Sequence, residues 1–158
     1  MKTKPLALLL ALVLAGCMGE PASVPAQAPG ANAPINVARA SVADIALEAR
    51  LIDAMTLGAP MARQYGIPRT DGHWLLLVTL RDAEGNGVPA DAVSVEARAG
   101  GLTDALTPVA LRTISVNGLN DLVGVIEAKA PGTVRIEIDA LHDGARAEMR
   151  FTRDLPKP

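Results

Sequence analysis

HWLLLVTLR, residues 73–81, is the most apolar run in the chain beyond residue 41. Successive side chains of a strand point to opposite faces, and here both faces carry large apolar groups, with Trp74 on one and Leu75 on the other. A strand that faces water on one side alternates apolar with polar residues instead. We therefore predict that residues 73–81 form a central β-strand that is covered on both sides.

Shorter stretches around this run alternate with a period of two, which is typical of half-buried strands. Together with 73–81 they give seven strands in about a hundred residues, separated by turn residues, as expected for a β-sandwich. We predict an all-β fold, a single antiparallel immunoglobulin-like sandwich, with one short helix after Pro60 at residues 61–65. The other six strands are expected at residues 45–52, 93–99, 109–116, 122–128, 134–141 and 145–151.

The last two strands flank Asp143-Gly144, a dipeptide typical of a two-residue hairpin turn. On one face this turn sets Ile136 opposite Phe151, Ile138 opposite Met149 and Ala140 opposite Ala147. On the other face Glu137 meets Arg150, while Asp139 opposes Glu148, an unfavourable pair for which we expect Arg146 to lie diagonally within reach.

The N-terminus has the features of an export signal. Lys2 and Lys4 precede an apolar stretch at residues 6–15, which is too short to span a bilayer. The stretch ends in LAGC, residues 14–17, which resembles the lipobox of bacterial lipoprotein signals at all four positions. The resemblance implies cleavage before Cys17, a diacylglycerol on its sulfur and an acylated amino group.

The chain therefore divides into three parts: a lipoprotein signal peptide at 1–16, the lipidated Cys17 with a flexible Pro- and Ala-rich linker at 17–41, and the sandwich domain at 42–156. We expect a lipid-anchored protein of the cell envelope that faces the periplasm, with the membrane as a partner through Cys17. Because Met18 is not the Asp that retains lipoproteins in the inner membrane of many bacteria, the resemblance carries an expectation of outer-membrane sorting. Cys17 is the only cysteine, so we expect no disulfide.

Composition argues against several classes of partner. Residues 1–16 hold two lysines and no acids, so the remaining chain has 13 basic and 17 acidic residues. Nucleic-acid binding depends on basic contacts to phosphate, and we predict no nucleic-acid partner. Only Tyr65, Trp74 and Phe151 are aromatic, which disfavours a stacking platform for bases.

The residues that carry catalysis or bind metals are few. His73 and His142 are the only histidines, and no cysteine besides Cys17 could complete a zinc site with them. No serine lies in a G-x-S-x-G motif, and Gly85-Asn86-Gly87 lacks the lysine and helix of a phosphate-binding loop. We predict no enzyme activity, no metal and no cofactor.

Tyr65, Arg69, His73 and Trp74 are the one concentration of interface-forming residue types. Tyr, Trp and Arg dominate the energetics of protein interfaces, so these four residues are candidates for a partner-binding edge. The alternative interpretation places Trp74 in the sandwich core and uses Tyr65 and Arg69 to fix the crossover before the central strand.

From about residue 42 to 155 the chain resembles a family of small exported bacterial domains of unknown function. The resemblance lies in YGIPRT (65–70), WLLLVTL (74–80), GLTDAL (101–106) and RFTRDL (150–155), with the first stretch as the most specific. It implies no reaction. The sequence thus favours a noncatalytic accessory or binding module of the cell envelope, with an envelope protein as its partner. The alternative is a periplasmic domain that handles a metal or another ligand.

Overall fold

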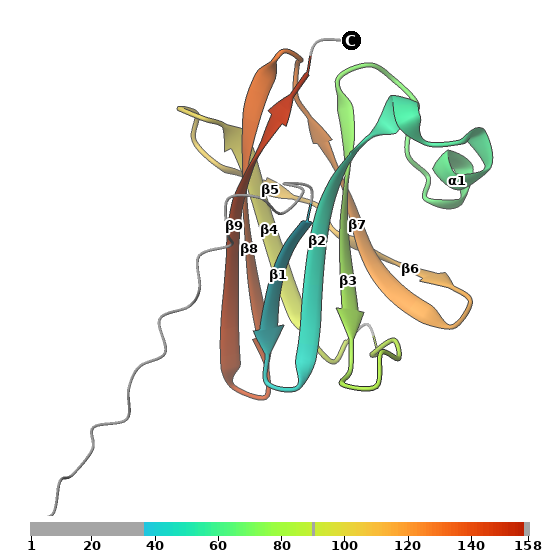
Figure 1. Cartoon of the computed structure of the whole chain (residues 1–158), viewed down its shortest axis with the longest axis vertical. Coiled ribbons are helices and arrows are strands. Elements are labelled where there is room, and N and C mark those ends of the chain that lie inside the picture. The colour runs from blue at the N-terminus through green and yellow to red at the C-terminus, as the bar shows by residue number, and fades with distance from the viewer. Residues whose placement is uncertain (1–36, 90, 157–158) are drawn as a thin grey trace, which may run out of the picture. The chain divides into compact units, whose positions relative to one another are not determined.

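A computed structural model describes residues 37–89 and 91–156. Two antiparallel sheets pack face to face in this part of the chain, as Figure 1 shows, so the predicted all-β sandwich is confirmed. The signal peptide, Cys17 and the linker up to residue 36 lie outside the described residues. The elements are β1 (Val37–Val42), β2 (Ile45–Asp53), the 3-10 turn η1 (Ala54–Thr56), α1 (Ala59–Gln64), β3 (His73–Arg81), β4 (Ser94–Gly101), β5 (Thr107–Val109), β6 (Arg112–Val116), β7 (Leu119–Glu127), β8 (Gly132–His142) and β9 (Ala145–Leu155).

The five-stranded sheet has the order β1-β2-β3-β7-β6, and the four-stranded sheet has the order β5-β4-β8-β9. β3 therefore lies at the centre of its sheet, as its apolar sequence predicts. The inner faces of the two sheets form one apolar core, and its largest fully buried members include Leu76 and Leu80 from one sheet and Ile136 and Ile138 from the other.

A second, smaller apolar cluster covers the outer face of β3 near its start. Leu75 there is fully buried and packs with Val123 of β7 and with Ala62 of α1. Pro60 occupies the first turn of this helix, where its missing N–H leaves no bond unmade. β3 is thus covered on both sides over its first half, while Thr79 in the second half is partly exposed. Neither helical element among the described residues is long and apolar enough to cross a bilayer.

The structure differs from the sequence prediction at two strands. β1 includes residues 37–41, which we expected in the linker, so the sandwich begins before residue 42. The expected single strand at 109–116 is two strands, β5 in one sheet and β6 in the other. The chain crosses between the sheets at residues 110–111, which raises the number of strands in the described residues to nine.

The closing hairpin has the predicted register. Every expected cross-strand pair is present, including Ile138 with Met149 and Asp139 with Glu148. Asp143 and Gly144 both have positive φ, at 47° and 81°, as a tight reversal of this kind requires. The cation beside Asp139 is not Arg146 but Arg98 of β4, whose Nη2 lies 3.0 Å from Asp139 Oδ2.

Gly124 of β7 marks the place where the chain crosses between the sheets. A Cβ at this position would lie 2.7 Å from Val109 Cγ1 and 3.2 Å from the Ala110 carbonyl oxygen. We expect Gly124→Ala to lower the free energy of unfolding by about 1–3 kcal/mol, because the crossing segment would have to shift. Urea unfolding measures this change.

Val109→Ala provides the control for Gly124→Ala. It removes the atom that makes the closest contact, so the double variant should lose less stability than the sum of the two single variants. Strict additivity of the two substitutions would show that the crossing does not depend on this contact.

Candidate functional site

The structure places Trp74 in the core and not on a partner-binding edge. Its side chain is 5% exposed, and its indole Nε1–H donates a hydrogen bond of 3.1 Å to the carbonyl oxygen of Ala128. Ala128 in turn donates its backbone N–H to the Gly72 carbonyl oxygen. Trp74 therefore fixes the segment that follows β7 and is closed to a partner.

Tyr65 and Arg69 hold the segment between α1 and β3. Tyr65 ends α1 and packs, partly buried, on the second apolar cluster. Arg69 Nη2 donates to the Met55 carbonyl oxygen at 3.2 Å, which ties residues 55 and 69 together. This arrangement supports the alternative role that the sequence suggested for both residues, the fixing of the crossover.

The two histidines lie at opposite ends of the sandwich. His73 begins β3, and its Nε2 is 3.8 Å from Glu127 Oε1. His142 ends β8, where Nδ1 lies 2.7 Å from the Ala92 carbonyl oxygen and Nε2 lies 4.0 Å from Asp44 Oδ1. Asp44 immediately precedes β2, whose start pairs with the end of β3. The length of β3, roughly 25 Å, therefore separates the two imidazoles.

No group of three or more His, Cys, Asp or Glu side chains within residues 37–89 and 91–156 is arranged to hold a metal ion. His142 has the two exposed carboxylates of Asp44 and Asp143 near Nε2, at 4.0 and 3.6 Å. These contacts link the turn between β1 and β2 to the tip of the closing hairpin.

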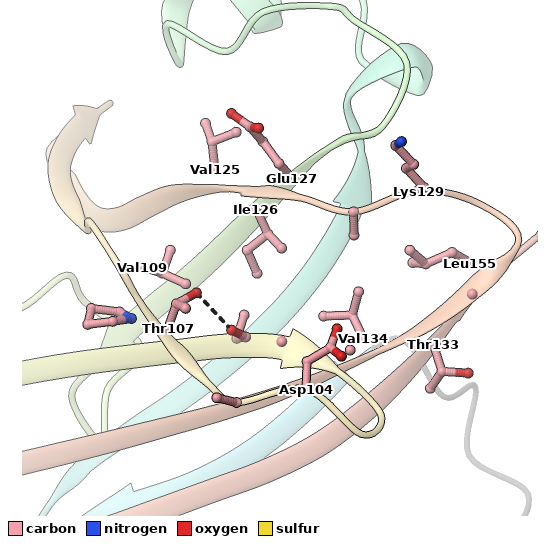
Figure 2. Close-up of a pocket in the computed structure, with 17 residues that line it drawn as sticks. Asp104, Thr107, Val109, Val125, Ile126, Glu127, Lys129, Thr133, Val134 and Leu155 are labelled. Atoms are coloured by element: carbon pink, nitrogen blue, oxygen red, sulfur yellow. Dashed lines mark hydrogen bonds between the residues drawn. The ribbon is translucent and has the colours of Figure 1, made fainter.

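A hollow of about 620 Å³ opens between the two sheets at the end opposite His142. It is lined by the ends of β4, β7 and β9, by β5 and by the start of β8. Figure 2 shows Ile126 of β7 pointing into this hollow toward β4, and Val134 of β8 and Leu155 of β9 also line it. Its volume lies within the usual range of ligand sites in proteins.

Small residues on the inner face of β4 leave room for this hollow. Stacked sheets lie about 10 Å apart, and the inner side chains of both sheets must fill that space. β4 contributes only Ala97, Ala99 and Gly101 on its inner face toward the end of the strand. Polar side chains stand around the hollow, among them Asp104 and Lys129. The arrangement can bind an apolar group and contact polar groups beside it.

A second, shallower depression of about 400 Å³ lies on the outer face of β1, β2 and β3. Glu48 at its centre accepts hydrogen bonds from Arg39 and Arg50. Partial burial by itself raises the pKa of Glu48, but the hydrogen bond and charge of Arg50, with those of Arg39, outweigh it and lower the pKa. Arg81, at the other side, is paired with Asp121 at 2.7 Å. These charges are paired with one another, so the hollow between the sheets is the stronger candidate site.

Sequence reasoning did not find the hollow, because its walls come from five strands, β4, β5, β7, β8 and β9, that belong to two different sheets. The one local signal is the alternation of Ala97, Ala99 and Gly101, which marks an inner face without large side chains. Of the candidate residues from the sequence, Cys17 lies outside the described residues. Tyr65, Arg69 and His73 do not line the hollow, and Trp74 is in the core.

Two solved structures are similar in fold. A crystal structure of a DUF4426 family protein from Pseudomonas aeruginosa PAO1 superposes with a TM-score of 0.61 at 16% identity, covering 78% of this chain and 97% of that chain. A copper-bound variant of FetP from uropathogenic Escherichia coli strain F11 superposes with a TM-score of 0.50 at 11% identity, covering 73% of this chain and 92% of that one. Identities this low show a shared fold only. No curated protein matches the sequence.

The family model of DUF4426, a domain of unknown function, matches residues 41–156. The match spans nearly all of the sandwich, and it confirms the prediction of a family of domains without an assigned function. The lipobox and the specificity of the YGI-x-R stretch stay predictions. The chain belongs to the DUF4426 family.

Proposed function

We propose that this chain is a noncatalytic, lipid-anchored binding module of the bacterial cell envelope. The acylated Cys17 holds it in the membrane, with outer-membrane sorting expected, and the sandwich faces the periplasm. The observation that carries the binding role is the hollow between the sheets, in which buried Ile126, Val134 and Leu155 lie beside exposed polar groups. An envelope protein is the proposed partner.

Site-specific photo-crosslinking in intact cells tests this function. A benzophenone side chain is placed at Asp104, which is exposed and lines the hollow, and separately at Ser94, which is exposed at the start of β4. We expect a discrete adduct with one envelope protein from Asp104 and none from Ser94. Equal adducts from both positions, or an adduct from Ser94 alone, would contradict a binding site at the hollow.

Handling of a metal is the second candidate function. It is suggested by the copper in the FetP structure, a protein that shares only the fold with this chain. Copper affinity usually requires several convergent nitrogen, sulfur or carboxylate ligands. Calorimetric titration of the purified chain with copper and zinc distinguishes the two functions, and tight binding with a stoichiometry of one would favour metal handling.

A further inference from the structure

One edge of β7 is left open beside the hollow. β6 pairs with Leu119–Val123 only, although β7 continues to Glu127. Within the part of the chain that the structure describes, residues 124–127 pair with β3 on one side and with no strand on the other. An unpaired strand edge presents backbone N–H and C=O groups to any extended chain that approaches it.

The hydrogen-bond pattern shows which residues of β7 face the open edge. The N–H of Ala128 donates to the Gly72 carbonyl oxygen at 2.9 Å, in register with the β3–β7 ladder. Bonded residues alternate along an antiparallel strand, so Ile126 also bonds toward β3. Val125 and Glu127 therefore direct their N–H and C=O groups to the open edge.

β5, on the opposite side of the hollow, is a poorer edge for strand addition. It is three residues long and pairs with Ala97–Ala99 of β4. Its middle residue, Pro108, has no N–H to donate, and proline on an edge strand blocks further pairing. Of the two edges that border the hollow, only that of β7 offers a complete set of backbone groups.

We propose that the hollow binds an extended segment of a partner protein, which adds as a strand to β7 at Val125–Glu127. This proposal rests on the proposed function and names its ligand. In this geometry the partner residue opposite Ile126 points into the hollow, where a medium-sized apolar side chain meets Val109 and Val134. Strand addition supplies affinity through the backbone and selectivity through this side chain.

The charge at the edge favours a basic residue in the partner. Figure 2 shows Val125 and Glu127 pointing away from the hollow, so the partner residue opposite Glu127 lies on the outer face. The Glu127 side chain is 82% exposed, and opposite charges on facing residues of neighbouring strands attract. The linker of this chain is a poor occupant, because Pro21, Pro25, Pro29 and Pro34 interrupt it.

Binding of synthetic peptides to the purified, acylated chain in detergent micelles tests the proposal. The probes are acetylated hexapeptides in which Val or Leu alternates with Lys, Thr or Glu. We expect hydrogen exchange at the amides of Val125 and Glu127 to be fast in the free protein and slow in the complex, with Ile126 slow in both. Lysine peptides should bind more tightly than glutamate peptides, and Glu127→Lys should reverse that order.

Val125→Pro is the decisive variant, because the N–H that it removes points to the open edge of β7 and not to β3. We expect it to weaken peptide binding by about tenfold or more, whereas Val125→Ala, which keeps the N–H, should change binding by less than about threefold. Trp74 fluorescence reports whether the proline variant is folded. If it is not, peptides N-methylated at alternate residues test the same bonds in the unaltered protein, and they should fail to bind.

The outcomes separate this proposal from the proposed function. No protection of Val125 and Glu127 at about 1 mM peptide, or equal binding by Val125→Pro, would overturn strand addition. Ala99→Leu fills the hollow from β4. If it abolishes the cellular adduct at Asp104 while Val125→Pro retains it, the binding module stands without strand addition. If both variants retain the adduct, the hollow is not the binding site and the proposed function fails too.

Discussion

Replacing Trp74 with alanine is expected to lower the free energy of unfolding by about 3–5 kcal/mol. The indole is buried in the main core beside Leu76 and Ile126, and its removal leaves a cavity that rigid strands on both sides cannot fill. The substitution also leaves the Ala128 carbonyl oxygen without its donor. Urea unfolding followed by far-ultraviolet circular dichroism measures the change.

Two further variants separate the contributions to this effect. Trp74→Phe keeps most of the apolar volume and loses the hydrogen bond to Ala128, so it should cost about 1–3 kcal/mol. Tyr65→Ala removes an aromatic side chain that is only partly buried, and it should cost less than Trp74→Ala. A loss below about 1 kcal/mol for Trp74→Ala would be incompatible with a core position and would return Trp74 to the candidates for a binding surface.

The closing hairpin shows how much of the fold is encoded locally. Alternating apolar residues and the Asp143-Gly144 turn determine the register of β8 and β9 from adjacent sequence alone, and every predicted pair is present. The partner of Asp139 is not encoded by adjacent sequence. Arg98 lies 41 residues away in the sequence, and it reaches Asp139 only because β4 pairs with β8. Local spacing suggested Arg146, because strand order within a sheet is not a local property.

The difference between local sequence and strand order also explains the wrong predictions at β1 and at the β5–β6 crossing. Residues 37–42, VARASV, alternate weakly, and their alanines resemble the Ala-rich linker before them. β1 is stabilised by pairing with β2, which the composition of β1 itself does not reveal. In residues 109–116 a continuous β-like pattern hides a change of sheet. The change becomes visible only from Gly124, which lies in β7 and leaves space for the crossing segment.

The candidate site depends even more on contacts between distant segments of the chain than the strand boundaries do. Tyr65, Arg69, His73 and Trp74 are close in sequence and chemically suited to an interface, yet each packs on or contacts a neighbouring segment of the chain. The hollow instead depends on the small side chain of Ala99, which lines it from β4. It depends also on β6 being shorter than β7. The space between the sheets and the unpaired edge of β7 exist only in the assembled sheets, so local sequence does not predict them.

Cys17→Ser is expected to abolish the lipid anchor, the largest change that any single substitution should cause in how the chain is held at the membrane. Each buried methylene of an acyl chain contributes about 0.8 kcal/mol, so two or more chains anchor a protein stably, whereas the serine variant has no thiol to receive the diacylglycerol. We expect this variant to lose incorporation of labelled fatty acid and to keep its uncleaved signal peptide. Mass spectrometry of the intact chain and fractionation of the envelope measure both effects.

Met18→Asp provides the matched control, because it leaves the LAGC motif and the acyl chains in place. If the signal works as its resemblance to lipoproteins implies, this variant should remain acylated and move from the outer to the inner membrane. The two substitutions thus separate attachment from sorting. A Cys17→Ser protein that still incorporates fatty acid and stays in the membrane fraction would show that Cys17 is not the anchor.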